Sequence, residues 1–587
     1  MNLVRDIMSM EWVESVDFGV PARQQVGSWW TPSPSDREIA EGILRGNLRL
    51  EPHPNWVFGS QIEWDADPFN QRNWTFQLHS MKWLDVVRRT AEQSPEDSEF
   101  ARFWVHTVFD WSARYLNAVD HPVAWMDMAD GMRTIEFVLG AKLVPDDLFR
   151  EYLDILRLHA EKLADPSRRV GGNHGLHQLQ GLLVVASFLR DDELKLSAAT
   201  DLVGLFNSEY DVEGTNKEGA LAYHDLNYHW WQLAFDRLEL EGIKLGSASR
   251  RLEDSRKHLA QFVRPDGNLE TIGDTSPGRV LTADGSETTQ FVRTRGKDGV
   301  APSDKRILLG AGYAAGRGTW GSTSTEFQNA TFYTIKWAKS EVHGHDDSTS
   351  LTVFSGGVPW LVDPGMYAYQ PGRERRFFKG RSAHNVVFSS TLKFEFEEGS
   401  LVASAFDEDV DAYWIKQTVR DYGTNERILI YLRQFDAFVV ADRIIKSNTV
   451  EAFGRFAQLW QLHPDTEMHV GMRTVSLKNR RSSITMRWLN RPKFESLRGQ
   501  VDPMRGWYSP GYSQIVKTSS LSVIPASAKR AEWVSIISVG EFDLVPLSAK
   551  WDRGQFRMTF AIGGESKYLA FDERGDMTLT PIGDEVK

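Results

Sequence analysis

The 587-residue chain contains no cysteine. This absence excludes disulfide bonds, thiolate nucleophiles and cysteine metal ligands, so any metal site must use nitrogen and oxygen donors. Long apolar runs are also missing. The longest, near Leu182 to Leu189, is far too short to span a bilayer, so no membrane partner is expected.

A secretory leader is not evident either. The first twenty residues carry Arg5, Asp6, Glu11, Glu14 and Asp17 and no apolar stretch. We therefore expect a cytoplasmic protein, or a periplasmic one if a leader was removed. The net charge of −12 argues against a nucleic-acid partner, but an anionic ligand could still bind in a locally basic cleft.

Aromatic residues are abundant, with 21 Trp, 32 Phe and 15 Tyr. Their flat rings can stack on sugars or fill a large core, and composition alone favours the core. The hydrophobic share of 41% and the charged share of 25% are ordinary for a folded globular chain. A chain of this length is expected to form about two to four domains.

The hydrophobic period changes once along the chain. From about residue 74 to residue 263, apolar residues recur at steps of three and four, as in Asp146 to Asp165, and predict successive helices. After a loop-rich passage, short alternating runs such as Ser483 to Trp488 predict antiparallel strands. We predict a multidomain α+β architecture, with a helical domain over 1–275 and an antiparallel β-sandwich over 276–587.

Three histidines and an aspartate lie within 42 residues of the strand-rich region: His343, His345, Asp363 and His384. In a strand, His343 and His345 would face the same side because they are two residues apart. Asp363 and His384, brought in by neighbouring strands, would complete a nitrogen and oxygen ligand set that zinc accepts. The alternative is a buried pair of histidines without a metal.

The helical region holds two polar clusters. Asn173 and His174 follow two glycines, where they could line a cleft; spacing alone favours a helix start capped by Asn173. The run from Tyr223 to Trp231 contains two Tyr, two His and two Trp. A tyrosine flanked by imidazoles can carry protons, and Trp230 could stack on a sugar ring, although both tryptophans could equally pack inward.

Six ordered motifs, taken together, resemble those of the heparinase II/III-like polysaccharide lyases, a superfamily that includes oligo-alginate lyases and related exolyases. The motifs are Asn173-His174-Gly175, the passage around Tyr228, Gly267 to Asp274, His343-Gly344-His345-Asp346, Val362-Asp363-Pro364-Gly365 and Ala383-His384-Asn385. The resemblance covers nearly the whole chain. It implies an incomplete (α/α) toroid followed by an antiparallel β-sandwich.

The resemblance also implies roles for individual residues. Asn173, with His174 beside it, would neutralise the carboxylate of a uronate. A tyrosine would transfer protons at the scissile linkage, and Tyr228 is the choice by its distance from the Asn-His motif, with Tyr223 as the alternative. His343 would reach the cleft from the sandwich as a further catalytic residue.

Zinc is the cofactor that the resemblance implies, bound by His345, Asp363 and His384 in a structural role. For contact with the substrate we select Tyr223, His224, Trp230 and Arg376. Arg376 belongs to a basic run, Arg373 to Arg381, that could attract an anionic glycan or form a solvated loop.

These roles fit the chemistry of β-elimination. Removal of the C5 proton of a uronate places charge on its carboxylate, which donors such as Asn173 and a histidine can stabilise. Tyr228 and either His343 or His174 could then act as the base and the acid. Because tyrosine ionises only near pH 10, nearby positive charge would be needed to favour its ionised form.

We therefore predict a carbon–oxygen lyase that cleaves a uronic-acid-containing polysaccharide or oligosaccharide and leaves a C4–C5 double bond. Exo action on imported oligosaccharides is a further expectation, drawn from the absent leader. A uronyl C5-epimerase, which shares the proton abstraction, and a non-catalytic glycan-binding protein are the alternatives. The sequence is compatible with a homo-oligomer.

Overall fold

The computed structural model describes residues 16–20 and 33–582, except 119, 127, 339–341, 390–393, 449, 451–453, 527–529 and 553. Most of the segment used to judge a leader, residues 1–15, lies outside this range. The chain divides into two compact units, Met1–Tyr210 with Asn227–Leu252 and Asp211–Leu226 with Glu253–Lys587. The predicted boundary at residue 275 follows the change from helices to strands, whereas the compact units divide earlier.

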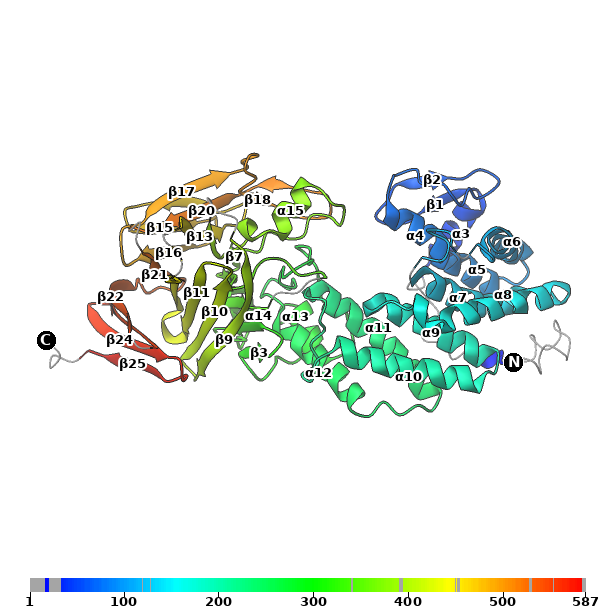
Figure 1. The fold of residues 1–587 in the computed structure, drawn as a ribbon, viewed down its shortest axis with the longest axis horizontal. Coiled ribbons are helices and arrows are strands. Elements are labelled where there is room, and N and C mark those ends of the chain that lie inside the picture. Colours follow the sequence, from blue (N-terminus) through cyan, green and yellow to red (C-terminus); the bar gives the residue numbers. More distant parts are fainter. Residues whose placement is uncertain are drawn as a thin grey trace. The chain divides into compact units, whose positions relative to one another are not determined.

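Helices form most of the first unit (Figure 1). They are α3 Asp36–Leu44, α4 Arg72–Ser80, α5 Asp85–Gln93, α6 Ser98–Tyr115, α7 Met128–Gly140, α8 Asp146–Ala164, α9 Gly172–Phe188 and α10 Asp192–Glu209, with a hairpin of β1 Asn47–Arg49 and β2 Asn55–Val57. The chain passes from one compact unit to the other within helix α11 Leu221–Leu240 and again within helix α12 Ser247–Gln261. Within the described residues, no helix is long and apolar enough to cross a membrane.

Helices α7 and α9 approach each other at two glycines. A Cβ atom at Gly131 would lie 2.2 Å from the carbonyl oxygen of His177, and one at Gly181 would lie 2.7 Å from the Cα atom of Gly131. No side chain fits at either position, so glycine is required for this close contact. The contact fixes α9, whose first turn carries Asn173 and His174.

The start of α9 differs from the prediction. The helix begins at Gly172 and its N-cap residue is Gly171, so Asn173 is not the cap. The amide of Gly172 instead donates to Glu209 Oε1 of α10 at 3.2 Å. A neighbouring helix therefore satisfies one of the free amides of the first turn of α9.

The second unit is built mainly of antiparallel strands (Figure 1). One sheet runs β3-β4-β5-β6-β7, an eight-stranded sheet runs β14-β15-β16-β21-β12-β11-β10-β9, and two four-stranded sheets run β17-β20-β13-β8 and β22-β23-β24-β25. A short pair, β18-β19, accompanies them. The helices-first, antiparallel-sheets-second order confirms the α+β prediction.

The predicted run Ser483–Trp488 coincides with one of the strands of the second unit, β16. The strands are β3 Arg306–Leu309, β4 Tyr313–Arg317, β5 Phe332–Lys336, β6 Leu351–Ser355, β7 Val358–Leu361, β8 Val387–Ser389, β9 Phe396–Phe406, β10 Val410–Val419, β11 Gly423–Leu432, β12 Ala437–Lys446, β13 Phe456–Gln461, β14 Glu467–Val470, β15 Thr474–Lys478, β16 Ser483–Trp488, β17 Lys493–Arg498, β18 Trp507–Tyr508, β19 Val516–Lys517, β20 Ser519–Ile524, β21 Ala531–Ser538, β22 Val545–Asp552, β23 Gln555–Ile562, β24 Glu565–Asp572 and β25 Met577–Pro581. Short helix α13 Glu287–Arg293 precedes β3, and short helices α14 Ser324–Asn329 and α15 Arg373–Lys379 lie between strands.

The eight-stranded sheet has an apolar core on each face. In β10, Tyr413 and Ile415 pack into one core, whereas Ala412 and Trp414 pack into the other. Alternate residues of a strand point to opposite faces, so a sheet covered on both sides needs apolar residues at successive positions. This requirement explains the unbroken apolar run Ile428 to Leu432 in β11.

A neutral histidine is buried in the helical core. The Nε2 atom of His159 accepts a hydrogen bond from Arg133 Nε at 3.1 Å, and its Nδ1 atom lies 2.9 Å from the carbonyl oxygen of Ile155. Burial and then the charge of Arg133 lower the pKa of His159 to about 3. The unfolded chain takes up this proton below about pH 6.5, so the free energy of unfolding falls as the pH falls from there toward 3.

We expect His159→Gln to weaken this pH dependence. The wild type should lose up to about 1.4 kcal/mol of unfolding free energy per pH unit from this group below about pH 6.5, and the variant should lack that contribution. Denaturant unfolding at about pH 7 and about pH 5.5 gives the change in unfolding free energy between the two pH values for each protein. Any effect of the substitution that does not depend on pH cancels in this change. His106→Gln, at an exposed position of α6, is the matched control. Equal pH dependence in wild type and His159→Gln would contradict the prediction.

Candidate functional site

The buried carboxylate of Asp274 gathers three side chains in the second unit. Its Oδ1 atom accepts from His345 Nε2 at 2.9 Å and Arg375 Nη1 at 2.6 Å, and its Oδ2 atom accepts from His343 Nδ1 at 3.0 Å and Arg375 Nη2 at 2.7 Å. Burial alone would raise the pKa of Asp274, but these hydrogen bonds outweigh it and hold the pKa well below its usual range. Asp274 is therefore a permanent anion. We call Asp274, His343, His345 and Arg375 the Asp274 cluster.

Backbone hydrogen bonds join three segments at this cluster. The amide of His343 donates to the carbonyl oxygen of Glu218 at 3.0 Å, and the amide of Asp274 donates to the carbonyl oxygen of His343 at 2.9 Å. At Gly273, which has a φ of +61°, a Cβ atom would lie 2.5 Å from the carbonyl oxygen of Gly219. Glycine is therefore needed where the chain turns into Asp274.

The prediction of a strand around His343 and His345 is wrong. Both residues lie in a loop between β5 and β6. The backbone amide of His343 bonds to Glu218 and its carbonyl oxygen to Asp274, neither of which belongs to a strand. The two imidazoles nevertheless contact one carboxylate, through its two different oxygens.

One ring nitrogen of His343 is hydrogen-bonded to a carboxylate, and the other is available for proton exchange. Its Nδ1 atom binds Asp274, whereas its Nε2 atom lies 3.7 Å from Glu218 Oε2. The ring stacks on Tyr223, with centroids 3.5 Å apart and planes 11° apart. The side chain of His343 is 19% exposed, and that of His345 is fully buried. This arrangement is suited to an imidazole that exchanges a proton through Nε2.

Tyr223 is held by a second tyrosine. Its hydroxyl donates to the hydroxyl of Tyr369 at 2.8 Å. Burial, followed by Tyr369 and the carboxylates of Asp274 and Glu218, raises the pKa of Tyr223 well above its usual range. Its hydroxyl therefore stays protonated.

A possible metal site adjoins the Asp274 cluster. His345, Asp363 and His384 are buried, and each offers a ligand atom within 4.8 Å of the others. His345 Nδ1 and His384 Nε2 are buried nitrogens without a hydrogen-bond partner among the described residues. Two such nitrogens beside a carboxylate fit zinc, since a bound cation would satisfy both. His384 Nδ1 lies 2.9 Å from Asp363 Oδ2, so Asp363 either binds the metal or orients His384.

A buried arginine of the central sheet fixes the segments that carry these ligands. Arg427 of β11 forms a two-bond ion pair with Asp442 of β12, at 2.7 and 2.8 Å. Its Nη1 atom donates to the carbonyl oxygens of Thr349 and Asn385, at 2.5 and 2.6 Å. Asn385 directly follows His384, and Thr349 lies four residues after His345. The segments of His345 and His384 are therefore attached to the central sheet.

The other predicted catalytic residues belong to the first unit. Asn173 is buried and His174 half-buried in the first turn of α9. Tyr228 of α11 is buried, and its hydroxyl donates to Gln232 Oε1 at 3.4 Å. Trp230 is half-buried and meets His177 edge to face, with centroids 5.1 Å apart. Of the predicted catalytic set, His343 alone belongs to the second unit.

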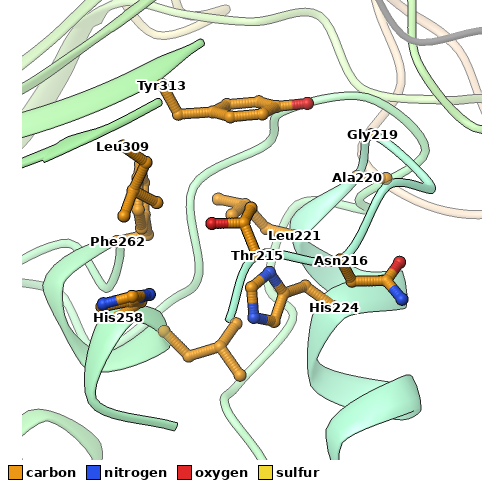
Figure 2. Close-up of a pocket in the computed structure, with 11 residues that line it drawn as sticks. Thr215, Asn216, Gly219, Ala220, Leu221, His224, His258, Phe262, Leu309 and Tyr313 are labelled. Carbon is orange, nitrogen blue, oxygen red and sulfur yellow. The ribbon is translucent and has the colours of Figure 1, made fainter. Parts of the chain in front are cut away.

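His224 faces a small internal cavity. Figure 2 shows His224 of α11 and His258 of α12 turned toward this space, with Tyr313 of β4 above them. The cavity measures about 10 Å³, room for about one water molecule. His224 Nε2 lies 2.6 Å from Ser255 Oγ, and burial, then His258, lowers the pKa of His224 to about 3. This position favours a structural role for His224 over the predicted contact with substrate.

The basic run forms helix α15 and not a solvated loop. Arg375 is buried against Asp274, and Arg381 is buried with its Nε atom bound to the carbonyl oxygen of Val387 at 2.8 Å. Arg376 is exposed, so its guanidinium is accessible to the anionic substrate that it is predicted to contact.

No role was assigned from the sequence to Asp274, Glu218 or Tyr369, and none to Arg375 apart from its place in the basic run. Asp274 closes one of the six motifs, and its preceding glycine was the available signal. Arg375 was visible only as one cation among several. Asp274 stands 69 residues before His343 and 101 residues before Arg375, so spacing along the chain could not join them.

Both halves of the chain match models of known protein families. Residues 33–231 match the model described as heparinase II/III N-terminus, and residues 311–538 match the model described as heparinase II/III-like, C-terminal. The chain belongs to the heparinase II/III family. The prediction of a lyase with a polysaccharide lyase fold is therefore confirmed.

Relatives of this family resemble the chain over most of its length. It is 24% identical over 482 residues to a heparin-sulfate lyase of Pedobacter heparinus, which covers 73% of this chain and 68% of that protein. A crystal structure of a mutant heparan sulfate lyase HepC from Pedobacter heparinus gives a TM-score of 0.72 at 18% identity, covering 93% of this chain and 91% of that one. The crystal structure of a heparinase III gives 0.75 at 14% identity, covering 96% and 100%. These likenesses confirm the fold, an incomplete helical toroid followed by antiparallel sheets.

We expect protein purified without chelator to carry about one zinc ion per chain. His384→Ala should lower the zinc content several-fold, because it removes a ligand whose Nε2 atom has no other described partner. His469→Ala, an exposed histidine of β14, is the control and should keep the wild-type content. Elemental analysis of the three proteins gives the result, and a wild-type content far below one would contradict the metal site.

Asp274→Asn should weaken zinc binding about ten- to hundred-fold, because it removes the anion that orients His345. Competition with a zinc-binding dye measures the affinity. Asp346→Asn, in the loop that carries His345 and without a hydrogen bond to His345, controls for the loss of one negative charge. Equal zinc affinity in wild type and Asp274→Asn would show that Asp274 does not support the metal ligand.

Proposed function

We propose that this polysaccharide lyase cleaves an anionic, uronate-containing glycan of the heparin or heparan sulfate class by β-elimination. The observation that carries the proposal is the orientation of His343, whose Nδ1 atom is bound by a buried carboxylate while Nε2 lies on a partly exposed side chain. The names of the relatives, heparin-sulfate lyase and heparan sulfate lyase, support the choice of substrate class.

The proposed reaction moves one proton from carbon to oxygen. A base removes the proton at C5 of the uronate, the electron pair forms the C4–C5 double bond, and the bond from C4 to the glycosidic oxygen breaks. An acid protonates the departing oxygen. Asn173 and His174 are proposed to stabilise the charge on the uronate carboxylate, and His343 to exchange a proton through Nε2.

The two tyrosines of α11 are proposed to have different roles. The pKa of Tyr223 is raised by burial and by nearby carboxylates, so its hydroxyl is a weak acid and its anion is disfavoured. Its ring lies flat against His343 and limits rotation of the imidazole. We therefore assign Tyr223 to positioning His343, and Tyr228 remains the proposed proton carrier.

Zinc is proposed as a structural partner of the site, held by His345, Asp363 and His384. When bound, it would supply positive charge that keeps these side chains in place. Asp274 binds His345 through Oδ1 and His343 through Oδ2, so order at the metal ligands would extend to the imidazole of His343.

We expect wild type to generate the ultraviolet absorbance of a C4–C5 unsaturated uronate when it is mixed with heparin or heparan sulfate. His343→Ala should lower kcat by about 10²- to 10⁴-fold, since it removes the oriented imidazole. Tyr228→Phe should abolish turnover, whereas Tyr223→Phe keeps the stacked ring and should retain most of it. Product lengths at early times separate exo from endo action.

A panel with hyaluronan and alginate tests the substrate class. Turnover only on alginate would overturn the proposed glycan, and absence of new absorbance on every polymer would overturn elimination. Deuterium uptake at C5 without cleavage would indicate the epimerase. Loss of turnover in Tyr223→Phe with full activity in Tyr228→Phe would exchange the roles of the two tyrosines.

A further inference from the structure

A basic groove lies in the second unit, and no member of the Asp274 cluster lines it. The groove has a volume of about 1190 Å³. Its walls are the turn before β7, the segment from His463 into β14, the turn between β15 and β16, and the ends of β17 and β20. This volume exceeds that of most small-molecule pockets, about 300 to 1,000 Å³, and fits a ligand longer than one sugar.

Four exposed cations line the groove: Lys478, Arg480, Arg481 and Arg498. None of them forms an ion pair within the part of the chain that the structure describes. Unpaired like charges gathered in a hollow raise the local positive potential, even in a chain of net charge −12. An anionic ligand would offset that charge, and guanidinium groups bind carboxylate and sulfate oxygens with paired hydrogen bonds.

A turn of two glycines lies beside one of these cations. β6 and β7 are joined by Gly356 and Gly357, with φ values of +59° and +75°. A Cβ atom at Gly357 would lie 3.4 Å from Arg481 Nη1. The tight turn therefore leaves the guanidinium of Arg481 beside bare backbone, where it remains exposed.

A buried hydroxyl in the groove also lacks a partner. Thr466 is 5% exposed, and its Oγ1 atom has no hydrogen-bond partner among the described residues. Buried hydroxyls are nearly always hydrogen-bonded in folded proteins, so an unpaired one in a groove wall points to a ligand or a water. This observation is independent of the cations.

The remaining lining favours a glycan over a nucleic acid. Asp465 and Glu467 can accept hydrogen bonds from the hydroxyl groups of a sugar chain. Single-stranded nucleic acid is commonly bound by aromatic stacking, and no Trp, Tyr or Phe is among the described lining residues.

The groove lies close to the candidate metal ligands along the chain. Val358 lines the groove and starts β7, and Asp363 follows five residues later. Five extended residues span at most about 18 Å. A polymer held in the groove is therefore near the site.

We propose that this groove is a second, non-catalytic binding site for an anionic glycan chain that carries carboxylate or sulfate groups. The choice of a glycan rests on the proposed function, while the groove, its cations and Thr466 do not. The site holds a long polymer beside the catalytic residues and adds to the affinity for long substrates over short ones.

The test measures binding without turnover. Full-length His343→Ala protein is applied to immobilised heparin at low salt, alone and with Arg480→Gln/Arg481→Gln. The groove variant should bind at least about ten-fold more weakly, because two charge-assisted contacts are lost. The control is Arg557→Gln/Arg574→Gln, which removes the same charge from exposed positions of β23 and of the turn after β24 and should bind within about two-fold of the parent.

Equal weakening in the two double variants, or no weakening in the groove variant, would overturn the proposal. So would a single-stranded oligonucleotide that binds the groove more tightly than heparin. Retention on desulfated heparin would assign the contacts to carboxylates, and its loss would assign them to sulfates; both support a glycan site. If wild type binds heparin through the groove but never cleaves it, the proposed function fails and the groove proposal stands.

Discussion

The anionic charge of Asp274 is the constraint on which the functional half of the second unit depends. A buried, ionised carboxylate is very unfavourable unless charge and hydrogen bonds compensate it. Here four donor atoms from His343, His345 and Arg375 surround its two oxygens. The segment after α12, the loop before β6 and helix α15 therefore have one low-energy arrangement, and removal of any donor would leave charge uncompensated.

The two oxygens of the Asp274 carboxylate orient two different histidines. Oδ1 orients His345, whose other nitrogen lacks a partner within the described chain, whereas Oδ2 orients His343, whose other nitrogen is left for proton exchange. Two histidines separated by one glycine thus acquire different chemistry from their surroundings. Arg375 bridges both oxygens, and its charge lets one aspartate support two imidazoles without itself becoming protonated.

The sequence predicted the elements with strong periodicity and missed the contacts that loops make. Helix α8 and strand β16 follow the predicted runs, because an apolar stripe or an alternation specifies its own period. His345, Asp363 and His384 were named as metal ligands through the family resemblance, and they lie together although the strand expected around His345 is a loop. Asp274 and Arg375 could not be paired, because their contact depends on how separate loops meet. Helix α9 begins before the expected cap Asn173, and a glutamate from α10, distant in sequence, binds the amide of its first residue, Gly172.

The attachment of the ligand segments to Arg427 has a kinetic consequence. Because His345, Asp363 and His384 are all buried and the segments of His345 and His384 are anchored to the central sheet, an ion could enter or leave only when that part of the protein opens locally. The pocket would already be shaped before an ion arrives, so binding would require little reorganisation. A zinc ion bound there would exchange at the rate of this opening, and a competing chelator would remove it no faster at higher concentration.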